Sequence, residues 1–201
     1  MREPLLLATS NPGKGEEFRR LLSSLPLTLI DLKEAGLEEY LVEEDGKTFS
    51  ANAWKKALFY SRLFPGPVVA DDSGLLVPRL GGFPGVHSAR IAPTVQERNL
   101  LLLQKASSLK GPDREALFRT SLALAWKGRK IALFHGEVRG RLLEEPSGEG
   151  GFGYDPLFYY HPLRKSFAQA EGESKNRVSH RGRAVEALLR FLLVHPYPWD
   201  L

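Results

Sequence analysis

The sequence predicts an α/β fold built on a mixed β-sheet. Short apolar runs that are typical of strands alternate with segments of helical periodicity along the chain. Two long strand-like segments are separated only by Lys127-Gly128-Arg129, which indicates a hairpin within the sheet. Glycine-rich polar loops follow the ends of several predicted strands, and open α/β sheets bind their ligands at such positions.

The length of the chain favours a single domain spanning residues 1–201. With 201 residues the chain is long enough to bury a substantial core. Charged residues make up 26% and hydrophobic residues 42%, which is typical of globular proteins and argues against disorder. The sequence contains no internal repeat or low-complexity linker that would require a division into two domains.

The first predicted strand covers residues 4–9, where a tight apolar run precedes the turn residues 10–13. A helix is expected from about Lys14, because apolar side chains recur at helical spacing on one face: Phe18, Leu21, Leu22 and Leu25. Residues 27–32 are predicted as a second strand. An acidic loop follows and ends at residues 43–46.

A second helix is expected to run to about Leu63, with Thr48 or Ser50 as its N-terminal cap. Residues 68–70 are predicted as a buried strand that leads into the turn 71–74. A further apolar segment follows this turn, at residues 75–77.

In the second half of the chain, residues 94–97 form a capping box that opens a helix to about Leu109. Two long strands follow, at residues 116–126 and 130–142, and a shorter one is predicted at 156–160. The last helix is expected to begin near Ser179 and to end at His195-Pro196.

The sequence contains no cysteine. A disulfide framework, a Cys-ligated zinc or iron–sulfur cluster and a thiol nucleophile are therefore excluded. Catalytic roles must fall to Asp, Glu, Ser, His, Lys or Tyr, or to a hard metal ion bound by oxygen. The net charge of +4 is compatible with a polyanionic partner but is also common in soluble proteins.

We expect a cytoplasmic protein without membrane association. The early apolar run, Leu5–Ala8, is too short for the core of a signal peptide. The late run, Ala187–Val194, is interrupted by Arg190 and is too short to span a bilayer.

The segment Thr9-Ser10-Asn11-Pro12-Gly13-Lys14 is a candidate phosphate-binding turn between a strand and a helix. Backbone N–H groups at a helix start favour an anion, and Lys14 adds an ammonium group. The spacing differs from that of a P-loop, and a capped turn that binds nothing is an equal alternative.

The pair Asp71-Asp72, followed by Ser73-Gly74, is the candidate acidic centre. Adjacent residues of a strand point to opposite faces, so the two carboxylates need not share one role. A second acidic cluster, Glu43-Glu44-Asp45, lies in a loop that the fold can bring near. This supply of carboxylates suits Mg²⁺, although solvated acidic turns are common.

Two later segments supply further candidates. In Gly150-Gly151-Phe152-Gly153-Tyr154-Asp155, glycines permit close approach of a ligand, an aromatic ring can stack on a base, and Asp155 can accept a ring N–H. One of the two aromatics is expected to dock in the core instead. In residues 175–183, basic side chains and His180 lie at the start of the last helix. The alternative for this cluster is a solvated face; no aromatics are interleaved there to indicate nucleic-acid binding.

Together these segments provide a phosphate cradle, carboxylates for a metal or a base, a stacking loop and a group of donors. This combination indicates a protein that acts on a nucleoside triphosphate.

The sequence resembles the inosine triphosphate pyrophosphatase family. The resemblance is carried by six motifs in order along the chain: Thr9-x-Asn11-x-x-Lys14, Glu44-Asp45-Gly46 with Thr48-Phe49 and Asn52-Ala53, Asp71-Asp72-Ser73-Gly74-Leu75, Pro84-Gly85-Val86-x-Ser88-Ala89-Arg90, Gly151-Phe152-Gly153-Tyr154-Asp155-Pro156, and Ser179-His180-Arg181-Gly182.

This resemblance implies a strongly twisted mixed sheet flanked by helices, with two lobes and an active site in the cleft between them. It also implies Mg²⁺-dependent hydrolysis of ITP, dITP and XTP to the monophosphate and pyrophosphate, usually by a homodimer. The implied metal ligands are Glu44 and Asp72, and Asp72 is also the implied base that activates water. The implied substrate-binding residues are Thr9, Ser10, Asn11, Pro12, Gly13, Lys14, Ser73, Phe152, Gly153, Tyr154, Asp155, Lys175, His180 and Arg181.

Two other functions stay open at this point. One is a related pyrophosphatase that prefers modified pyrimidine nucleotides. The other is a non-catalytic nucleotide sensor or nucleic-acid binder, against which the paired carboxylates argue because they repel polyanions. The sequence leaves the roles of Asp71 and Arg90 undecided, as well as the means by which GTP is excluded.

Overall fold

The computed structural model describes residues 4–23 and 28–195. The chain forms two compact units, and it passes from one to the other four times. The first unit comprises residues 1–72, 120–136 and 181–201, and the second comprises residues 73–119 and 137–180. Each unit has its own hydrophobic core.

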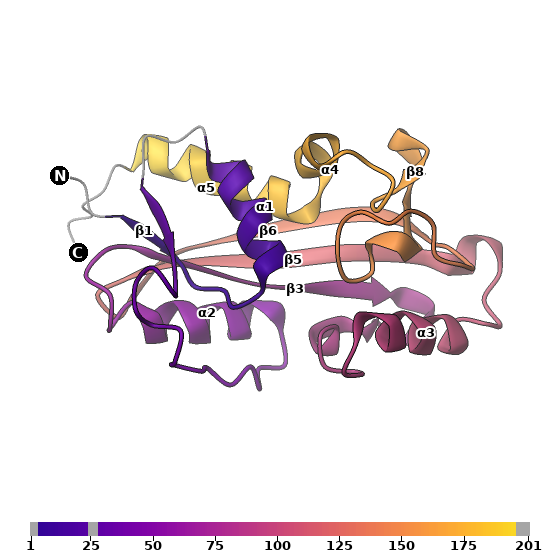
Figure 1. Ribbon diagram of the computed structural model, residues 1–201, viewed down its shortest axis with the longest axis horizontal. Helices are drawn as coiled ribbons and strands as arrows, with labels where there is room; N and C mark the ends of the chain where they lie inside the picture. Colours follow the sequence, from indigo (N-terminus) through magenta and orange to yellow (C-terminus); the bar gives the residue numbers. More distant parts are fainter. Residues whose placement is uncertain (1–3, 24–27, 196–201) are drawn as a thin grey trace. The chain divides into compact units, whose positions relative to one another are not determined.

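The first unit has helices on both faces of its strands, as the ribbon shows (Figure 1). Its complete elements are β1 (Leu5–Leu7), α1 (Pro12–Leu22), β2 (Leu29–Asp31) and α2 (Phe49–Tyr60). It also holds the N-terminal half of β3 (Val68–Val77), the C-terminal part of β5 (Glu115–Trp126), the N-terminal part of β6 (Arg129–Leu142) and almost all of α5 (His180–Val194).

Alternation along β1 decides which helix packs on which face of this unit. Leu5 and Leu7 belong to the cluster that contains apolar side chains of α1 and α5. Leu6, which lies between them, belongs to the cluster with Ala53, Ala57 and Tyr60 of α2. Successive residues of a strand point to opposite faces, so a fully apolar strand is buried on both sides.

The second unit is built around α3 (Val95–Lys105) and the remaining strand segments. Its other elements are β4 (Phe83–Pro84), β7 (Phe158–Tyr160), β8 (Lys165–Ser166), α4 (Gly172–Val178) and five short 3₁₀ turns. Its core brings Leu102 of α3 together with an aromatic group from the strands and loops: Phe118, Tyr154, Phe158, Tyr160 and Phe167.

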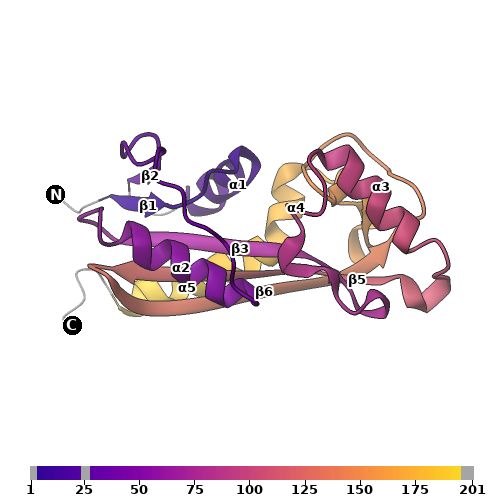
Figure 2. The ribbon, with the colours of Figure 1, turned by 90° about the horizontal axis from the view of Figure 1, so that it is seen from below.

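The strands follow the order β2-β1-β3-β5-β6-β7-β8, with β4 paired to β3. β1 is parallel to both β2 and β3, whereas β6–β7, β7–β8 and β3–β4 are antiparallel. Figure 2 shows β5 and β6 side by side, joined by the tight turn at Lys127 and Gly128. The sheet is therefore mixed, and the predicted α/β class and long hairpin are confirmed.

Most predicted elements are confirmed, with shifted ends. α1 begins at Pro12 instead of Lys14, and α2 is capped by Thr48, not Ser50. α3 has the expected capping box but ends at Lys105, before Leu109. Three positions named in the predictions, Leu25, Leu27 and Pro196, lie outside the described residues.

Two expectations were wrong. Residues 71–74 are not a turn, because β3 continues without a break from Val68 to Val77. Buried carboxylates are tolerated in this strand because cationic and amide side chains from helices surround them, as described below. The second wrong expectation concerns the start of the strand predicted at 156–160: residues 156–157 belong to a 3₁₀ turn, and β7 begins only at Phe158. In addition, α4 was not predicted. In the described part of the chain, no helix combines the length and apolar composition that crossing a bilayer requires.

Candidate active site

The start of α1 forms a capped turn with the geometry of an anion site. The Asn11 side chain accepts a hydrogen bond from the Lys14 backbone N–H at 3.1 Å, and Thr9 Oγ1 accepts one from Asn11 N–H at 3.2 Å. Pro12 occupies the first turn of the helix, and Ser10 is exposed. The N-terminal end of α1 is therefore preorganised, and it carries the partial positive charge that attracts phosphate.

Lys14, which follows this turn, is held by Asp71 of β3. Its Nζ lies 3.0 Å from Asp71 Oδ2, and the Asp71 side chain has no exposed surface. Burial alone raises the pKa of the Asp71 carboxyl, but Lys14, Arg181 and Lys56 outweigh burial and lower it to about 2. Asp71 is therefore a permanent anion, and it keeps these cations in place.

Arg181 at the start of α5 has a second buried partner that sequence analysis missed. Its Nη1 donates to Glu17 Oε2 at 2.7 Å, while its Nε lies 3.7 Å from Asp71 Oδ2. Glu17 lies in α1 and is almost completely buried. Its position three residues after Lys14, on the inner face of the helix, is the sequence signal that identifies it.

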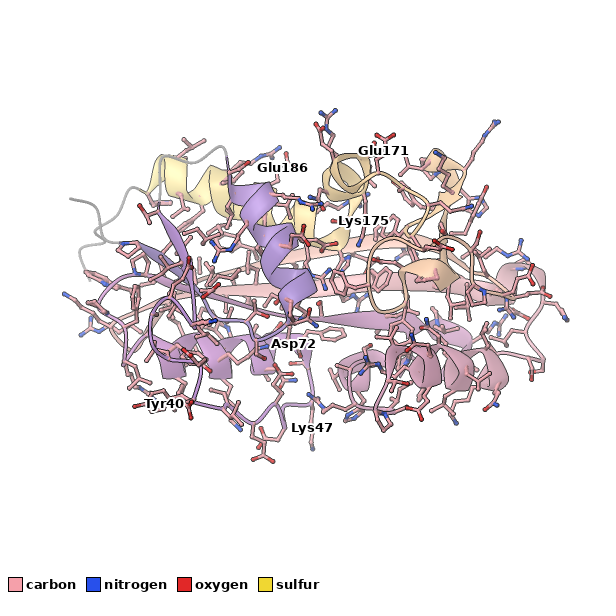
Figure 3. The ribbon with its side chains drawn as sticks, viewed as in Figure 1. Tyr40, Lys47, Asp72, Glu171, Lys175 and Glu186 are labelled. Carbon is pink, nitrogen blue, oxygen red and sulfur yellow. The ribbon has the colours of Figure 1, made fainter. Side chains whose placement is uncertain are left out.

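The carboxylate of Asp72 lies in a different environment from that of Asp71. Asn52 of α2 donates to Asp72 Oδ2 at 2.8 Å, and Thr120 Oγ1 donates to the Asp72 carbonyl oxygen at 3.3 Å. Burial raises the pKa of the Asp72 carboxyl, opposed by the charges of Lys14 and Lys56. A carboxylate with a raised pKa beside an amide donor is suited to accept a proton. Figure 3 shows Asp72 on β3, close to the N-terminal end of α1.

Asn52 also organises the acidic loop. Its Oδ1 accepts the Gly46 N–H at 2.7 Å, so one amide side chain bridges the loop and Asp72. A Cβ at position 46 would lie 2.5 Å from that oxygen, which explains the glycine. The Asn52-Ala53 motif of the sequence thus has a structural purpose.

Lys56, one turn further along α2, was also missed by sequence analysis. Its Nζ donates to the Asp71 carbonyl oxygen at 2.7 Å and pairs with the Glu44 carboxylate. Burial lowers the pKa of Lys56, but the neighbouring carboxylates of Asp71, Glu44 and Asp72 outweigh it, so the pKa is raised. The i, i+4 spacing of Asn52 and Lys56, which places both on one face of α2, is the signal for this residue.

The donor set of the first unit suits a divalent cation. Glu44 and Asp72 are close enough that the charge of Glu44 raises the pKa of Asp72, and a cation between them would relieve this repulsion. No group of three or more His, Asp or Glu side chains is assembled as a metal cage in residues 4–23 and 28–195. Two carboxylates suit an ion such as Mg²⁺, which keeps several waters and binds substrate phosphates.

In the second unit, Asp155 closes the glycine-rich loop. Its Oδ2 accepts the Phe152 N–H at 2.8 Å and the Lys175 ammonium at 2.5 Å, and both carboxylate and ammonium are buried. A Cβ at Gly151 would lie 2.3 Å from the same oxygen, and Gly151 has a φ of +70°. Asp155 therefore fixes the Gly151–Phe152 end of the loop and ties it to Lys175.

The two aromatic residues of this loop have different environments. Tyr154 lies in the core of the second unit, and its hydroxyl donates to the Ser88 carbonyl oxygen at 2.7 Å. Phe152 is only half-buried, with Lys175 Nζ 5.0 Å from its ring centroid. The expectation that one aromatic docks in the core is confirmed for Tyr154, and Phe152 is the more exposed of the two rings. Figure 3 shows Lys175 on α4.

Ser88 explains two of the sequence motifs together. Its Oγ accepts the Leu75 N–H at 3.0 Å and donates to the Gly85 carbonyl oxygen at 2.6 Å. A Cβ at Gly74 would lie 2.3 Å from Ser88 Oγ. Gly74 therefore packs directly against Ser88. The motif that contains Ser88 also supports Tyr154, because the Ser88 carbonyl oxygen accepts the hydrogen bond from the Tyr154 hydroxyl. Arg90 donates to the Val86 carbonyl oxygen at 2.9 Å, and Ser73 is half-buried.

The basic cluster of residues 175–183 is only partly a solvated face. Lys175, His180 and Arg181 are buried, and the His180 ring stacks on Phe118 with centroids 4.8 Å apart. Arg177 and Arg183 are exposed, and Arg177 pairs with Glu173. The three residues of this cluster that were expected to bind substrate are thus buried instead of solvated.

Comparison with known proteins agrees with this arrangement. The Ham1 family model matches residues 5–191 of the chain. The dITP/XTP pyrophosphatase of Thermus thermophilus is 45% identical over 199 residues, covering 98% of this chain and 95% of that protein. The dITP/XTP pyrophosphatase of Geobacter sulfurreducens is 44% identical over 188 residues, covering 92% of this chain and 94% of that protein. Among solved structures, a HAM1 protein from Coxiella burnetii has a TM-score of 0.86 and 35% identity, covering 96% of this chain and 100% of that one.

Proposed function

The chain belongs to the Ham1 family, and on that premise we propose that it is a pyrophosphatase of non-standard purine nucleoside triphosphates. It hydrolyses dITP, XTP and ITP to the monophosphate and pyrophosphate and so removes deaminated purines from the nucleotide pool. The names of the relatives support this substrate class and do not favour the alternative of modified pyrimidines.

The observation that carries the proposal is the contrast between Asp71 and Asp72. The pKa of Asp71 is lowered by three cations, whereas burial raises that of Asp72. We assign the proton transfer to Asp72: its carboxylate accepts a proton from the water that attacks the α-phosphorus. The bond between the α-phosphorus and the bridging oxygen breaks, and pyrophosphate leaves with that oxygen.

The triphosphate is bound by the N-terminal end of α1 together with Lys14 and Lys56. Backbone N–H groups of Thr9 to Lys14 donate to phosphate oxygens, and the two ammonium groups neutralise their charge. Asp71 keeps Lys14 charged, because the Asp71 carboxylate opposes the lowering of the lysine pKa by burial. Arg181, fixed by Glu17, adds a further donor.

The cofactor is a divalent cation, which we propose to be Mg²⁺, with Glu44 and Asp72 as its protein ligands. When bound, it supplies positive charge to the oxygens of the triphosphate. Lys56 pairs with Glu44 and thereby holds one of these ligands in place.

The purine is recognised by the second unit, in the part formed by Phe152 to Asp155, Lys175 and His180. The half-buried Phe152 ring is the stacking surface for the base. Hypoxanthine and xanthine carry an oxygen acceptor at C6, whereas adenine carries an amino donor there. A site that presents donors at this position rejects adenine by roughly 10⁴-fold.

We propose further that the whole chain acts as one domain, works in the cytoplasm and assembles as a homodimer. The single domain is supported by the interleaving of the two units along the sequence. The other two features are supported only by the family resemblance. Neither nucleic acid nor a membrane is proposed as a partner.

The test is pyrophosphate release from ITP, XTP, dITP, GTP, ATP, dTTP and UTP, each with and without Mg²⁺. We expect turnover of the first three to exceed that of the others and to require the metal. Equal turnover of ATP and ITP would refute the selectivity, and preference for the pyrimidines would favour the alternative. Salt-dependent binding of oligonucleotides without hydrolysis would refute the enzymatic function.

A further inference from the structure

A buried asparagine on α3 contacts the glycine-rich loop of the second unit. Asn99 Nδ2 donates to the Gly153 carbonyl oxygen at 3.2 Å, and the side chain is 8% exposed. The acceptor decides the orientation of this amide, because the reverse orientation would place Asn99 Oδ1 against the carbonyl. Oδ1 is buried and has no hydrogen-bond partner among residues 4–23 and 28–195. The Asn99 side chain is thus committed to one bond, and that bond is to the loop.

The contacts that hold this loop act on different parts of it. Gly150 N–H donates to the Ala168 carbonyl oxygen at 3.1 Å, and the Tyr154 hydroxyl donates to Ser88. Asp155 accepts the N–H of Phe152. Asn99 acts on the peptide group between Gly153 and Tyr154, and no other side chain of the described segments is hydrogen-bonded to that group.

The orientation of this peptide group follows from the contact. The peptide bond is trans, so its N–H points in the opposite direction from its C=O. With the Gly153 carbonyl directed at Asn99, the Tyr154 N–H points away from α3. Within residues 4–23 and 28–195 this N–H has no acceptor. It is a backbone donor inside the segment to which we assign base recognition.

The peptide also has a way to reverse. Rotation of this peptide group changes ψ of Gly153 and φ of Tyr154. Gly153 permits its part of the change because it has no Cβ, whereas Tyr154, with a φ of −93°, would move towards positive φ, so the reversed state is a minor one. Rotation of the peptide group would exchange the positions of N–H and C=O. A donor would then become an acceptor, and the preference for a 6-oxo group over a 6-amino group would be inverted.

We propose that Asn99 is a positioning residue for purine selectivity: it holds the Gly153–Tyr154 peptide so that the Tyr154 N–H donates to the 6-oxo group of the base. This inference rests on the proposed function. It adds a cause for the rejection of 6-aminopurines, which lies in a side chain on α3 that does not itself contact the substrate. Asn99 thus adds a side-chain hydrogen bond that favours one orientation of this peptide over its reversal.

The test compares Asn99→Leu, which keeps the volume and removes the donor, with the wild-type protein. The control is Gln104→Leu, which removes an exposed amide from the same helix. The measured quantity is the ratio of kcat/KM for ITP to kcat/KM for ATP. Both substrates are assayed with the same preparation of each protein. For Asn99→Leu we expect this ratio to fall by about 10-fold or more, with KM for ITP raised and kcat for ITP less affected. The control should leave the ratio unchanged.

A merely structural role would lower the activity on both substrates equally, because it would reduce only the fraction of folded protein. An unchanged ratio in Asn99→Leu therefore overturns the proposal. If this variant does not fold, Asn99→Ala is measured in the same way, and failure of both to fold shows that Asn99 serves the fold and also overturns it. A wild-type protein without preference for ITP over ATP would instead refute the proposed function itself.

Discussion

Asp71 and Asp72 are adjacent in β3, but their carboxylates have different partners and their pKa values are shifted in opposite directions. The Asp71 carboxylate lies 3.0 Å from Lys14 Nζ, and Asp72 accepts a hydrogen bond from Asn52 Nδ2 at 2.8 Å. Lys14 belongs to α1 and Asn52 to α2, the helices on opposite faces of the strands. The alternation of a β-strand thus separates a permanent counter-ion from the carboxylate to which we assign the proton transfer.

Replacing Asp72 by asparagine should abolish most activity without destabilising the protein. The variant loses the proton acceptor, so we expect kcat to fall by about 100-fold or more. Because burial raises the pKa of Asp72, its ionised form costs free energy in the folded state, and a neutral amide relieves that cost. The measurements are pyrophosphate release from ITP and the midpoint of thermal unfolding.

The matched control for this variant is Asp45→Asn, in which an exposed carboxylate paired with Lys55 is neutralised. This control should retain its activity. Activity of Asp72→Asn close to that of the wild type would exclude Asp72 as the base, whereas a large loss of stability would mean that its charge is needed for folding.

The pH dependence of kcat/KM should have an acid limb due to Asp72 and an alkaline limb due to Lys14. The base acts when deprotonated, so activity should rise with pH. Burial raises the pKa of Asp72 in the metal-free protein and a bound cation lowers it, so the acid limb should move to lower pH as the metal concentration increases. Burial lowers the pKa of Lys14 below 10.5, so its charge should be lost earlier than that of an exposed lysine. The measurement is kcat/KM for ITP against pH at low and at saturating metal. An acid limb that persists unchanged in the residual activity of Asp72→Asn would contradict the assignment.

Asp71→Asn should destabilise the protein strongly at neutral pH. Lys14, Arg181 and Lys56 would lose their shared buried anion, and breaking a buried ion pair from one side costs about 3–5 kcal/mol. Since the folded pKa of about 2 is below the ordinary 3.8, this stabilisation is complete above pH 3.8 and is lost as the pH falls through 2.

Urea unfolding at several pH values measures this effect. The difference between wild type and Asp71→Asn should be large at pH 7 and should shrink on acidification. Asp31→Asn, which removes an exposed partner of Arg19, is the control and should cost no more than about 1 kcal/mol. Equal costs for the two variants would show that Asp71 does not act as a buried counter-ion.

Most strands and helices could be predicted from the sequence because they depend on local periodicity and on capping residues. β3 was broken at Asp71 in the prediction, since two adjacent carboxylates normally end a buried strand. The charges that make them tolerable come from Lys14 and Arg181, which are 57 residues before and 110 residues after Asp71 in sequence. No local pattern reports such a partner. α4 was missed because its seven residues have no apolar periodicity.

Motifs with their own chemistry pointed to Lys14 and Asp155 in the sequence, and the structure places each of them in an ion pair with a buried partner. Glu17 and Lys56 were missed because a lone charged residue on a helix is usually solvated. Each contributes only through a partner brought close by the fold, Arg181 for Glu17 and Glu44 for Lys56. Burial of a charge, which distinguishes these residues, is a property of the folded chain.

Lys56→Met should weaken catalysis while strengthening metal binding. The variant removes a positive charge from the phosphate site, so kcat/KM for ITP should fall. It also releases Glu44 from its ion pair, and a divalent cation then no longer competes with an ammonium group for that carboxylate. We expect Mg²⁺ to bind the substrate-free variant roughly 10-fold more tightly, as titration calorimetry would measure.

Lys55→Met, which removes an exposed lysine and its ion pair with Asp45, is the control for this variant. Weaker Mg²⁺ binding in Lys56→Met would exclude Glu44 as a ligand.

Two glycine-to-alanine variants should change stability in opposite directions. A Cβ at Gly74 would lie 2.3 Å from Ser88 Oγ and 2.5 Å from the Gly85 carbonyl oxygen, so the strand and the loop must separate. This overpacking should lower the free energy of unfolding by about 1–3 kcal/mol or more. At Gly15, inside α1, a Cβ meets no atom within 4 Å, and alanine should stabilise the helix by about 0.5–1 kcal/mol. Denaturant unfolding of both variants measures the difference.

The Ser88 carbonyl oxygen also accepts a hydrogen bond from the Tyr154 hydroxyl, so Gly74→Ala should raise KM for ITP as well. If Gly74→Ala is as stable as Gly15→Ala, Ser88 does not pack against β3 in the way described.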